Sequence, residues 1–349
     1  MKIVSIIGTR PQFIKVDAID SIINDNHIII NTGQHYSDNM SDNIIKSLRI
    51  KDKEIYNVGI KSGDYTYSKQ MSLTIKEILK KIKYICPDFV FVYGDTNSTI
   101  AGAIASKKTP IKLVHIESGL RSHNIEMIEE INRILTDQMS DILCCPTKSS
   151  YDNLKEEGLN GYFVGDVMLD SIIHYSKEDY NKIKDDYILA TIHRSYNIKS
   201  TEKINNILDK LNILGKKKRI LIPIHPHTLK IQKQSNISLS KYKNIEFIDP
   251  VNYIDMISLI KNSFFVITDS GGVQKESFFL KKFCYVLRKE TEWTDILDLG
   301  WSILIELDDI ENIEFKEQPN IHDTSLFGDG HASEKILEIV KNNYIKQEI

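Results

Sequence analysis

Short apolar runs alternate with longer stretches of helical periodicity along most of this chain. The first half contains the almost wholly apolar runs Ile3–Ile7, His27–Asn31, Phe89–Tyr93, Lys112–His115, Ile142–Cys145 and Tyr162–Val164. Between them lie segments such as Tyr67–Ile82, whose apolar residues recur at helical spacing. Short apolar runs are typical of strands that are buried on both faces of a parallel sheet. The alternation therefore predicts a doubly wound α/β domain.

The alternation of strand and helix patterns stops near Gly165 and starts again near Tyr187. Residues 171–186 have a helical period and become strongly polar, which indicates a connection between two domains. The strands predicted for the second half are Tyr187–Thr191, Arg219–Ile224, Ile245–Ile248, Phe264–Thr268, Cys284–Leu287 and Ser302–Leu307. We therefore expect two Rossmann-like domains, residues 1–167 and 168–331, with a cleft between them. Ligands of such sheets bind at the carboxyl ends of the strands.

Composition and charge restrict the possible partners. The chain has 349 residues, 41% of them hydrophobic and 27% charged, which is typical of a soluble globular protein. Its net charge of −3 offers no general attraction for nucleic acid or an anionic membrane. No apolar run approaches the ~20 residues of a membrane span, and the N-terminal run is too short for a secretion signal. These features predict a cytoplasmic protein that binds neither nucleic acid nor membrane.

Neither the cysteines nor the histidines form a convincing metal pattern. The four cysteines lack paired metal-ligand spacing, and we expect them to be buried thiols in a reducing compartment. The segment PIHPHT (residues 223–228) has two histidines at a possible ligand spacing, but no third ligand is suitably placed. We therefore expect no metal and no cofactor.

Two loops suit a phosphorylated ligand. In TDSGGVQKES (residues 268–277), Ser270, Gly271 and Gly272 come where a predicted strand ends and a helix begins. Glycines permit a sharp turn and close approach to a ligand, and a helix N-terminus favours phosphate. An ordinary strand–helix turn is the alternative interpretation. In GTRPQFIK (residues 8–15), Arg10 and Lys15 place two cations near another helix start, where a diphosphate could bind. A surface turn with solvated charges is the alternative there.

Other polar residues follow predicted strands. Glu276 lies one helical turn beyond the glycines and suits a ribose diol better than a phosphate, whereas Arg288 ends the next strand and could offset diphosphate charge. His193 and His225 follow the first two strands of the second half. We expect all of them at the cleft.

Three acidic positions converge on one rim of the first domain. Asp95 in YGDTNST and Glu117 in HIESGLRS follow strands, and Glu129 comes shortly afterwards in IEEINR. Capping of the next helix by Asp95 or Thr96 is the simpler alternative for the first position. Three carboxylates at a cleft are candidate acid/base groups. With a diphosphate site in the other half, they suggest a nucleotide-sugar enzyme.

These motifs together resemble the non-hydrolysing UDP-N-acetylglucosamine 2-epimerases. The matching segments, in family order, are GTRPQFIK, TGQH, YGDTNST, HIESGLRS, EEINR, TIHR, TDSGGVQKES and VLRKETEW. The resemblance implies the GT-B architecture, a homodimer, and a final helix (332–349) that returns to the first domain. It also implies elimination of UDP with removal of the C2 proton, followed by re-addition to a 2-acetamidoglucal, in the synthesis of a surface polysaccharide.

By motif position, the resemblance assigns roles to individual residues. It gives acid/base places to Asp95, Glu117 and Glu129, and a fourth catalytic place to His193. The UDP-contact places fall on Arg10, Lys15, His225, Ser270, Gly271, Gly272, Glu276 and Arg288. The phosphate would bind Ser270 and the glycine N–H groups, and the ribose would bind Glu276.

Several departures from the family pattern bear on the sugar. The common GTRPE is GTRPQ here, HVEAGLR is HIESGLR, PEE is IEE, HRxEN is HRSYN, and TERPE is TEWTD. GTRPQ with TEW is more similar to the branch that acts on UDP-2,3-diacetamido-2,3-dideoxyglucuronate. The sugar is therefore either that one or UDP-N-acetylglucosamine.

Three other functions share parts of this pattern. A GT-B glycosyltransferase would also bind a UDP-sugar, but it does not need this set of carboxylates. A hydrolysing 2-epimerase usually carries Asp-Tyr-Gly after the Thr-Arg of the first loop, where this chain has Pro-Gln-Phe. A non-catalytic nucleotide-sugar-binding protein should have lost the acid/base residues.

Overall fold

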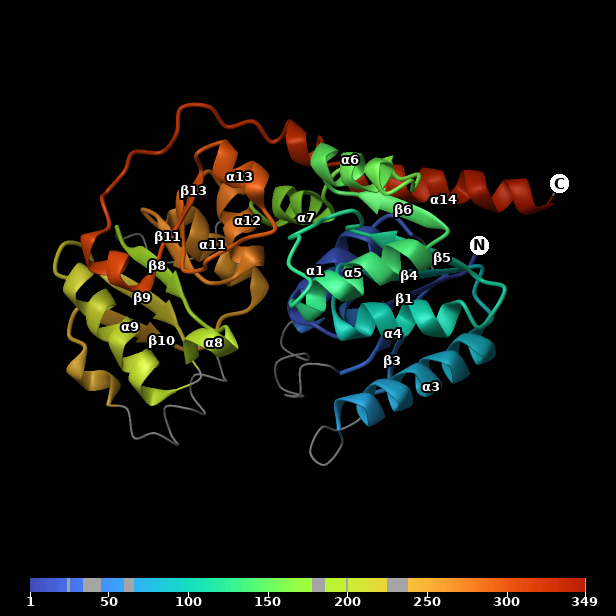
Figure 1. The fold of residues 1–349 in the computed structure, drawn as a ribbon, viewed down its shortest axis with the longest axis horizontal. Coiled ribbons are helices and arrows are strands. Elements are labelled where there is room, and N and C mark those ends of the chain that lie inside the picture. The colour runs from blue at the N-terminus through green and yellow to red at the C-terminus, as the bar shows by residue number, and fades with distance from the viewer. Residues whose placement is uncertain are drawn as a thin grey trace. The chain divides into compact units, whose positions relative to one another are not determined.

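The chain folds into two compact units in the computed structural model (Figure 1). Unit 1 comprises Met1–Ile173 and Thr324–Ile349, and unit 2 comprises His174–Asp323. The structure describes residues 1–23, 26–33, 45–59, 66–177, 186–198, 200–224 and 238–348.

Unit 1 is built on a parallel sheet with the strand order β3-β2-β1-β4-β5-β6-β7. Its strands are β1 (Ile3–Ile7), β2 (His27–Asn31), β3 (Ile55–Asn57), β4 (Phe89–Tyr93), β5 (Lys112–Ile116), β6 (Ile142–Cys145) and β7 (Tyr162–Phe163). Its helices are α1 (Arg10–Asp20), α3 (Tyr67–Ile85), α4 (Asn97–Ser106), α5 (Ile128–Met139), α6 (Lys148–Glu156) and α14 (Ala332–Glu348), and α7 (Val167–Tyr175) leads from unit 1 into unit 2. The strand order reverses between β1 and β4, so the loops after these strands lie where a doubly wound sheet binds ligands.

Unit 2 repeats the design with the strand order β10-β9-β8-β11-β12-β13, again all parallel. Its strands are β8 (Ile188–Thr191), β9 (Ile220–Pro223), β10 (Ile245–Ile248), β11 (Val266–Thr268), β12 (Cys284–Val286) and β13 (Ser302–Leu304). Its helices are α8 (Ser195–Ile198), α9 (Thr201–Leu214), α11 (Tyr253–Asn262), α12 (Gly271–Phe279) and α13 (Thr294–Asp298). Here the order reverses between β8 and β11, which places the loops after these two strands at the switch point.

Both faces of each sheet are covered, which explains the continuous apolar runs. Ile188 and Ala190 of β8 pack into one apolar cluster, whereas Leu189 between them packs into the cluster on the opposite face. In unit 1, Val4 and Ile6 face α3 and α4. Each such isoleucine, leucine or valine side chain stabilises the fold by about 1.5–3 kcal/mol when it is fully buried. The prediction of doubly wound α/β architecture is confirmed.

Strand β3 and several strand ends were not predicted. β3 has three residues and is partly exposed at the sheet edge, so it leaves no apolar run in the sequence. Strand β13 ends at Leu304, because a 3-10 helix begins at Leu307.

The C-terminal segment packs within unit 1. The Asp170 carboxylate accepts hydrogen bonds from the backbone N–H groups of Ala332 (3.2 Å) and Ser333 (2.8 Å) at the start of α14. Further along this helix, the Tyr344 ring lies 6.4 Å from that of Phe89 in β4. Of the helices that the structure describes, none has the length and apolarity that crossing a bilayer requires.

Three of the four cysteines are buried, and the expectation that all would be is wrong for Cys86. Cys86 ends α3 in a left-handed conformation (φ 50°) and is exposed. Burial raises the pKa of Cys145 to about 12, so the buried thiol stays protonated.

Candidate active site

In unit 1, a buried lysine of helix α1 forms an ion pair with a carboxylate. Thr9 caps α1, whose first residue is the half-buried Arg10. One turn further, the Lys15 ammonium forms an ion pair with the Glu117 carboxylate, and the side chains are only 8% and 10% exposed. Each charge therefore compensates the other at the carboxyl end of the sheet.

Glu117 adopts a backbone conformation that is unusual for a residue with a side chain. Its φ is +69°, in the left-handed region, and residues held there cluster at functional sites. Gly94, with φ +61°, lies against it, since a Cβ at Gly94 would be 2.8 Å from Glu117 Oε2. Asp95 follows Gly94 directly, so the β4–α4 and β5–α5 loops bring two carboxyl-bearing residues to one corner.

Asp95 is held by α5 rather than used as a helix cap. Of the two residues that could cap α4, the structure has Thr96 as the N-cap, which accepts from the Thr99 N–H, and Asp95 lies just before it. The Asp95 carboxylate pairs with the buried guanidinium of Arg133, and its backbone carbonyl accepts from Asn132 Nδ2 at 2.9 Å. Arg133 was not among the predicted site residues, although it lies in the same IEEINR motif as Glu129.

The two adjacent glutamates of α5 have different environments. Glu129, the expected third acid/base group, is exposed. Glu130 is 1% exposed, pairs with Arg133, and accepts from the backbone N–H groups of Ser122 and His123. Burial alone would raise the pKa of Glu130, but these N–H groups and the Arg133 charge outweigh it and lower the pKa. Glu130 is thus a charged structural group that fixes the segment after β5.

A second buried carboxylate on α5 fixes the loop that carries Glu117. Asp137 accepts from His115 (2.7 Å), Arg121 (2.8 Å) and the Gly119 N–H (3.1 Å). Burial by itself would raise the pKa of Asp137, but His115 and Arg121 outweigh burial and hold the pKa below its usual range.

The lowered pKa of Asp137 predicts a pH-dependent contribution to stability. Since the folded-state pKa lies below the ordinary value of about 3.9, the stabilisation is present above that pH and is lost as the pH falls through the lowered pKa. Asp137→Asn should reduce the free energy of unfolding by about 3–5 kcal/mol at pH 7, and by less at pH 3. Urea unfolding of both proteins at the two pH values measures this. An equal loss at both would contradict the charge-based account.

In unit 2, the Ser-Gly-Gly segment starts α12 as expected, but the serine cap rather than the flexibility of the glycines accounts for it. Ser270 caps the helix, and its Oγ accepts from the Val273 N–H at 3.4 Å. Neither Gly271 nor Gly272 has a positive φ, so the backbone conformation does not require glycine at either position. A Cβ at Gly272 would meet only Ser270 Oγ, at 3.7 Å, so packing does not require this glycine. The open space over the helix N-terminus is suited to a bound anion.

The other predicted UDP contacts of unit 2 are largely buried. Arg288 Nη1 donates to Glu292 Oε2 at 2.9 Å, and the Arg288 side chain is 3% exposed. The Glu292 carboxylate also lies against Gly271, where a Cβ would overlap it. Glu276 lies within α12 and is 6% exposed. An anion at this turn would therefore meet an arginine that already has a carboxylate partner.

His193 lies in the loop after β8, next to the buried carboxylate of Asp269, which was not among the predicted site residues. Asp269 is fully buried and accepts from the backbone N–H groups of His193 (3.1 Å) and Arg194 (2.9 Å). The His193 ring is 35% exposed, with Nδ1 3.5 Å from the Asp269 carboxylate. Asp269 directly precedes Ser270 in TDSGG, and this position could have identified it from the sequence. His225 and part of the TGQH motif lie outside the described residues.

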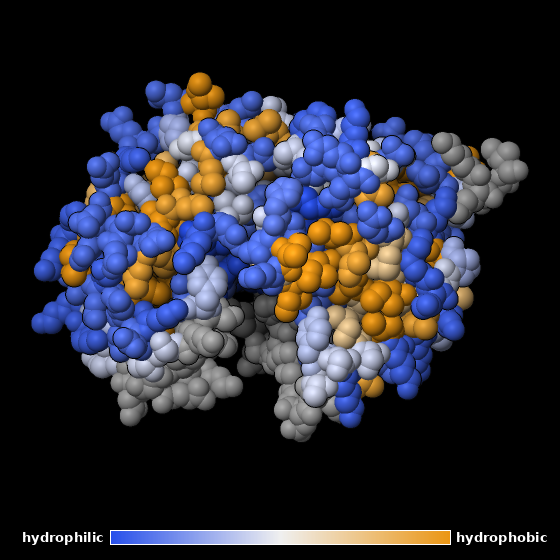
Figure 2. Space-filling view, in the orientation of Figure 1, coloured by the Kyte–Doolittle hydropathy of each residue, from blue (hydrophilic) through white to orange (hydrophobic). Residues whose placement is uncertain are grey.

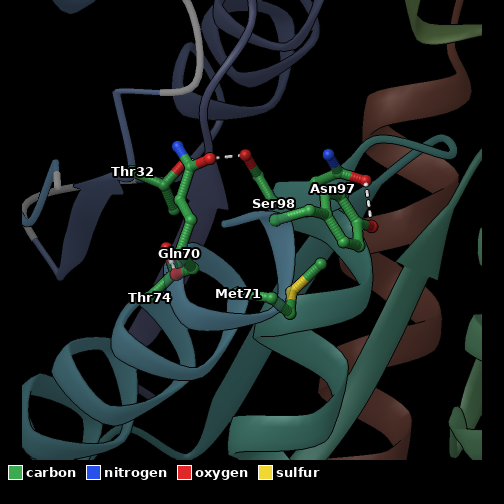
Figure 3. Close-up of a pocket in the computed structure, with 7 residues that line it drawn as sticks. Thr32, Gln70, Met71, Thr74, Asn97 and Ser98 are labelled. Atoms are coloured by element: carbon green, nitrogen blue, oxygen red, sulfur yellow. Dashed lines mark hydrogen bonds between the residues drawn. The ribbon is translucent and has the colours of Figure 1, made fainter. Parts of the chain in front are cut away.

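A cavity of about 270 Å³ adjoins the Asp95 loop in unit 1 (Figure 3). It is lined by Thr32, Tyr67, Gln70, Met71, Thr74, Asn97 and Ser98. Asn97 Oδ1 accepts from the Tyr67 hydroxyl at 3.1 Å and from Asn132 at 3.3 Å. None of these lining side chains is charged, so they offer a diphosphate no cation. The structure also shows no group of three metal-ligating side chains within its described residues.

The sequence pattern of a known family covers most of the chain. The family described as UDP-N-acetylglucosamine 2-epimerase matches residues 20–341. The chain belongs to this family. A UDP-N-acetylglucosamine 2-epimerase homolog of Methanococcus maripaludis is 42% identical over 98% of this chain and 100% of its own length. The UDP-2,3-diacetamido-2,3-dideoxy-D-glucuronate 2-epimerase of Pseudomonas aeruginosa is 40% identical over 97% and 99%.

A solved structure of the family supports the same conclusion. The Methanocaldococcus jannaschii UDP-GlcNAc 2-epimerase, in complex with UDP-GlcNAc and UDP, matches with a TM-score of 0.84 and 35% identity, covering 98% of this chain and all of that one. The expected GT-B class is thereby confirmed, as is the resemblance stated from the motifs.

Proposed function

We propose that this protein is a non-hydrolysing UDP-sugar 2-epimerase that inverts C2 of a 2-acetamido sugar. The main support for the proposal is the arrangement around Gly94, where Asp95 and Glu117 come from different loops. Asp95 pairs with Arg133, and Glu117 pairs with Lys15. Inversion needs proton removal on one face of C2 and delivery on the other. Two separately anchored carboxylates suit that task.

The reaction has two steps, an elimination of UDP and its re-addition. A carboxylate removes the C2 proton while the C1–O bond breaks, its electron pair leaves with UDP, and a 2-acetamidoglucal forms. UDP then adds back at C1 as the opposite face of C2 is protonated. Since the C2 proton is weakly acidic, its removal must be concerted with departure of UDP. We assign the acid/base work to Asp95 and Glu117, with Glu129 and His193 as further catalytic groups.

In unit 2, the start of α12 and the end of β12 carry the proposed UDP contacts. Ser270 and the N–H groups of Gly271 and Gly272 suit the phosphate at the helix N-terminus, and Arg288 adds a cation. Glu276 suits the ribose diol. Arg10, Lys15 and His225 complete the proposed contacts by motif position, and cations near the leaving group stabilise its charge.

The identity of the sugar follows from a direct test. Relatives named for UDP-N-acetylglucosamine and for the diacetamido uronate are 38% and 40% identical, so identity does not separate the substrates. Purified protein in D2O is given each UDP-sugar separately and followed by proton NMR. New manno-type anomeric signals with deuterium at C2 would establish epimerisation, and the reacting sample would identify the sugar.

The same experiment distinguishes the alternatives. Free sugar with UDP would indicate a hydrolysing epimerase. Binding of UDP with no exchange in either sample would favour a GT-B glycosyltransferase, which acts only when an acceptor is supplied.

We further propose that the protein acts as a homodimer through α5. The outward face of this helix carries Ile128, Ile131 and Leu135, which are 54%, 45% and 48% exposed, and Figure 2 shows an apolar patch over α5. The inward face carries the charged groups described above, the reverse of the usual helix pattern. A contiguous exposed apolar surface of this kind is typical of an interface, and a second copy of the same chain is the commonest partner.

This proposal predicts the effect of a charge on the outward face. Ile131→Glu should convert a dimer into a monomer of 40.2 kDa without unfolding it, because a carboxylate cannot be desolvated there without a partner. Light scattering coupled to gel filtration measures the mass. Ile213→Glu, at a 43% exposed position of α9, is the matched control and should leave the mass unchanged. A monomeric wild type would contradict the proposal.

The proposal also includes the cellular compartment of the enzyme and the use of its product. Four free cysteines suit a reducing compartment such as the cytoplasm, and the epimerised sugar would enter a surface polysaccharide. The proposed domains are residues 1–167 with 332–349, and residues 168–331.

A further inference from the structure

Gln12 of the GTRPQ motif is buried between the two loops that carry proposed active-site residues. It is the third residue of α1 and is 1% exposed. Its Oε1 accepts from the backbone N–H groups of Gly8 at 2.8 Å and Thr9 at 3.1 Å. The acceptor end of the carboxamide therefore fixes the turn that precedes Arg10.

The donor end of the same carboxamide reaches the β4–α4 loop. Gln12 Nε2 donates to the Tyr93 carbonyl at 2.7 Å and lies within hydrogen-bond distance of Thr96 Oγ1 (2.9 Å) and Thr99 Oγ1 (3.0 Å). Tyr93 and Thr96 flank Gly94 and Asp95 in the chain. One neutral side chain thus connects the loop that starts α1 with the loop that presents Asp95.

We propose that Gln12 is a positioning residue for the epimerase reaction. By connecting the two loops, it holds Asp95 in a fixed position relative to Lys15 and its partner Glu117, both of which lie in the same corner. It touches neither substrate nor reacting atoms, and it acts through the placement of Asp95. The inference rests on the proposed function, because it assumes that Asp95 serves C2 chemistry.

The carboxamide is suited to this place because its two ends have opposite hydrogen-bonding character. A glutamate, common at this position in the family, would accept from Gly8 and Thr9 equally well. Its second oxygen would then face the Tyr93 carbonyl, which has no proton to donate. Only a protonated glutamate could reproduce the donation to Tyr93, whereas an ionised one could still accept from the Thr96 or Thr99 hydroxyl. Gln12→Glu therefore restores the full connection only when it carries a proton.

The charged groups on the surrounding elements are few and mostly paired. Arg10 and Lys15 lie on α1, Asp95 lies in the β4–α4 loop, and Glu117 and Arg133 are the partners of Lys15 and Asp95. A glutamate at position 12 would add an acid to a site whose net charge is nearly balanced. Burial and the facing Tyr93 carbonyl would raise its pKa, whereas the N–H groups of Gly8 and Thr9 would lower it, so its protonated fraction increases as the pH falls.

The test compares two variants of the full-length protein. Gln12→Leu removes all the hydrogen bonds, and its kcat for the UDP-sugar that the wild type epimerises should fall by about 100-fold, the usual cost of a small misplacement. The Kd for UDP, measured by calorimetry, should rise far less than kcat falls, because Ser270, Gly271 and Gly272 are untouched and only the contact of the neighbouring Arg10 is disturbed. Gln12→Glu should be more active than Gln12→Leu at pH 6, and this advantage should shrink as the pH rises.

Gln318→Leu controls for the loss of a connecting glutamine. The Gln318 carboxamide accepts from the Phe283 N–H at 2.7 Å and donates to the Phe264 carbonyl at 3.0 Å, at the amino ends of strands in unit 2. This variant should lose stability but keep kcat.

Three results would overturn the inference: a Gln12→Leu kcat within twofold of wild type, equal losses of kcat and UDP affinity, or no advantage of Gln12→Glu at any pH. A wild type that exchanges no C2 proton with any UDP-sugar would instead overturn the proposed function, so the two failures are distinguishable.

Discussion

Glu117→Gln is expected to lower the kcat of epimerisation by about 10²-fold to 10⁴-fold, the usual contribution of an acid/base group. The amide cannot take or deliver the proton, although it has nearly the same shape. The affinity for UDP should change far less, since the proposed phosphate contacts at Ser270 and Gly272 are on another element and Lys15 keeps its charge. Steady-state kinetics and UDP calorimetry on the same sample measure the two effects.

The loss of an ion pair must be separated from the loss of chemistry. Removing the Glu117 charge leaves the buried Lys15 without its carboxylate, which costs stability. Asp141→Asn is a suitable control, because Asp141 pairs with Lys107 and accepts from the Leu113 N–H at the other end of the sheet. It should lower the melting temperature without lowering kcat. Unchanged turnover in Glu117→Gln would remove this residue from the mechanism.

Gly272→Ala is expected to weaken UDP binding while keeping or increasing stability. A methyl group at this position meets only Ser270 Oγ at 3.7 Å in the protein, and alanine favours the first turn of α12 by about 0.5–1 kcal/mol over glycine. The same methyl group would occupy space in front of the helix N-terminus. Losing one charge-assisted hydrogen bond of about 1.5–3 kcal/mol would weaken UDP binding by about 10-fold to 100-fold.

The neighbouring glycine provides the contrast. A Cβ at Gly271 would overlap the Glu292 carboxylate, so Gly271→Ala should destabilise the fold as well as affect the ligand. Thermal unfolding and UDP calorimetry on both variants distinguish the two positions. If Gly272→Ala binds UDP as tightly as wild type, the phosphate does not lie at this turn.

The architecture could be predicted from the sequence because buried parallel strands leave continuous apolar runs. The loops after β4 and β5 were found for the same reason, since each follows such a run, and this located Asp95 and Glu117. Strand β3 was missed because a short edge strand with exposed side chains leaves no such pattern.

The environment of each polar residue could not be predicted in the same way. Glu129 and Glu130 are adjacent and chemically identical, yet one is exposed and the other buried, because successive helical residues point about 100° apart. Since α5 turns its polar side inwards, its apolar pattern taken alone would identify the wrong face as buried. Arg133 and Asp269 were missed because their partners are distant in sequence.

The two-faced character of α5 also restricts insertions and deletions. One residue inserted just before Glu130 would turn the remainder of the helix by about 100°. Arg133 would then leave Asp95, and isoleucines would point towards the buried charges. Length differences between this chain and other members of the family should therefore lie in the connecting segments, where added residues do not alter helical phase. An alignment that places a gap between residues 128 and 139 would misassign the residues that hold Asp95.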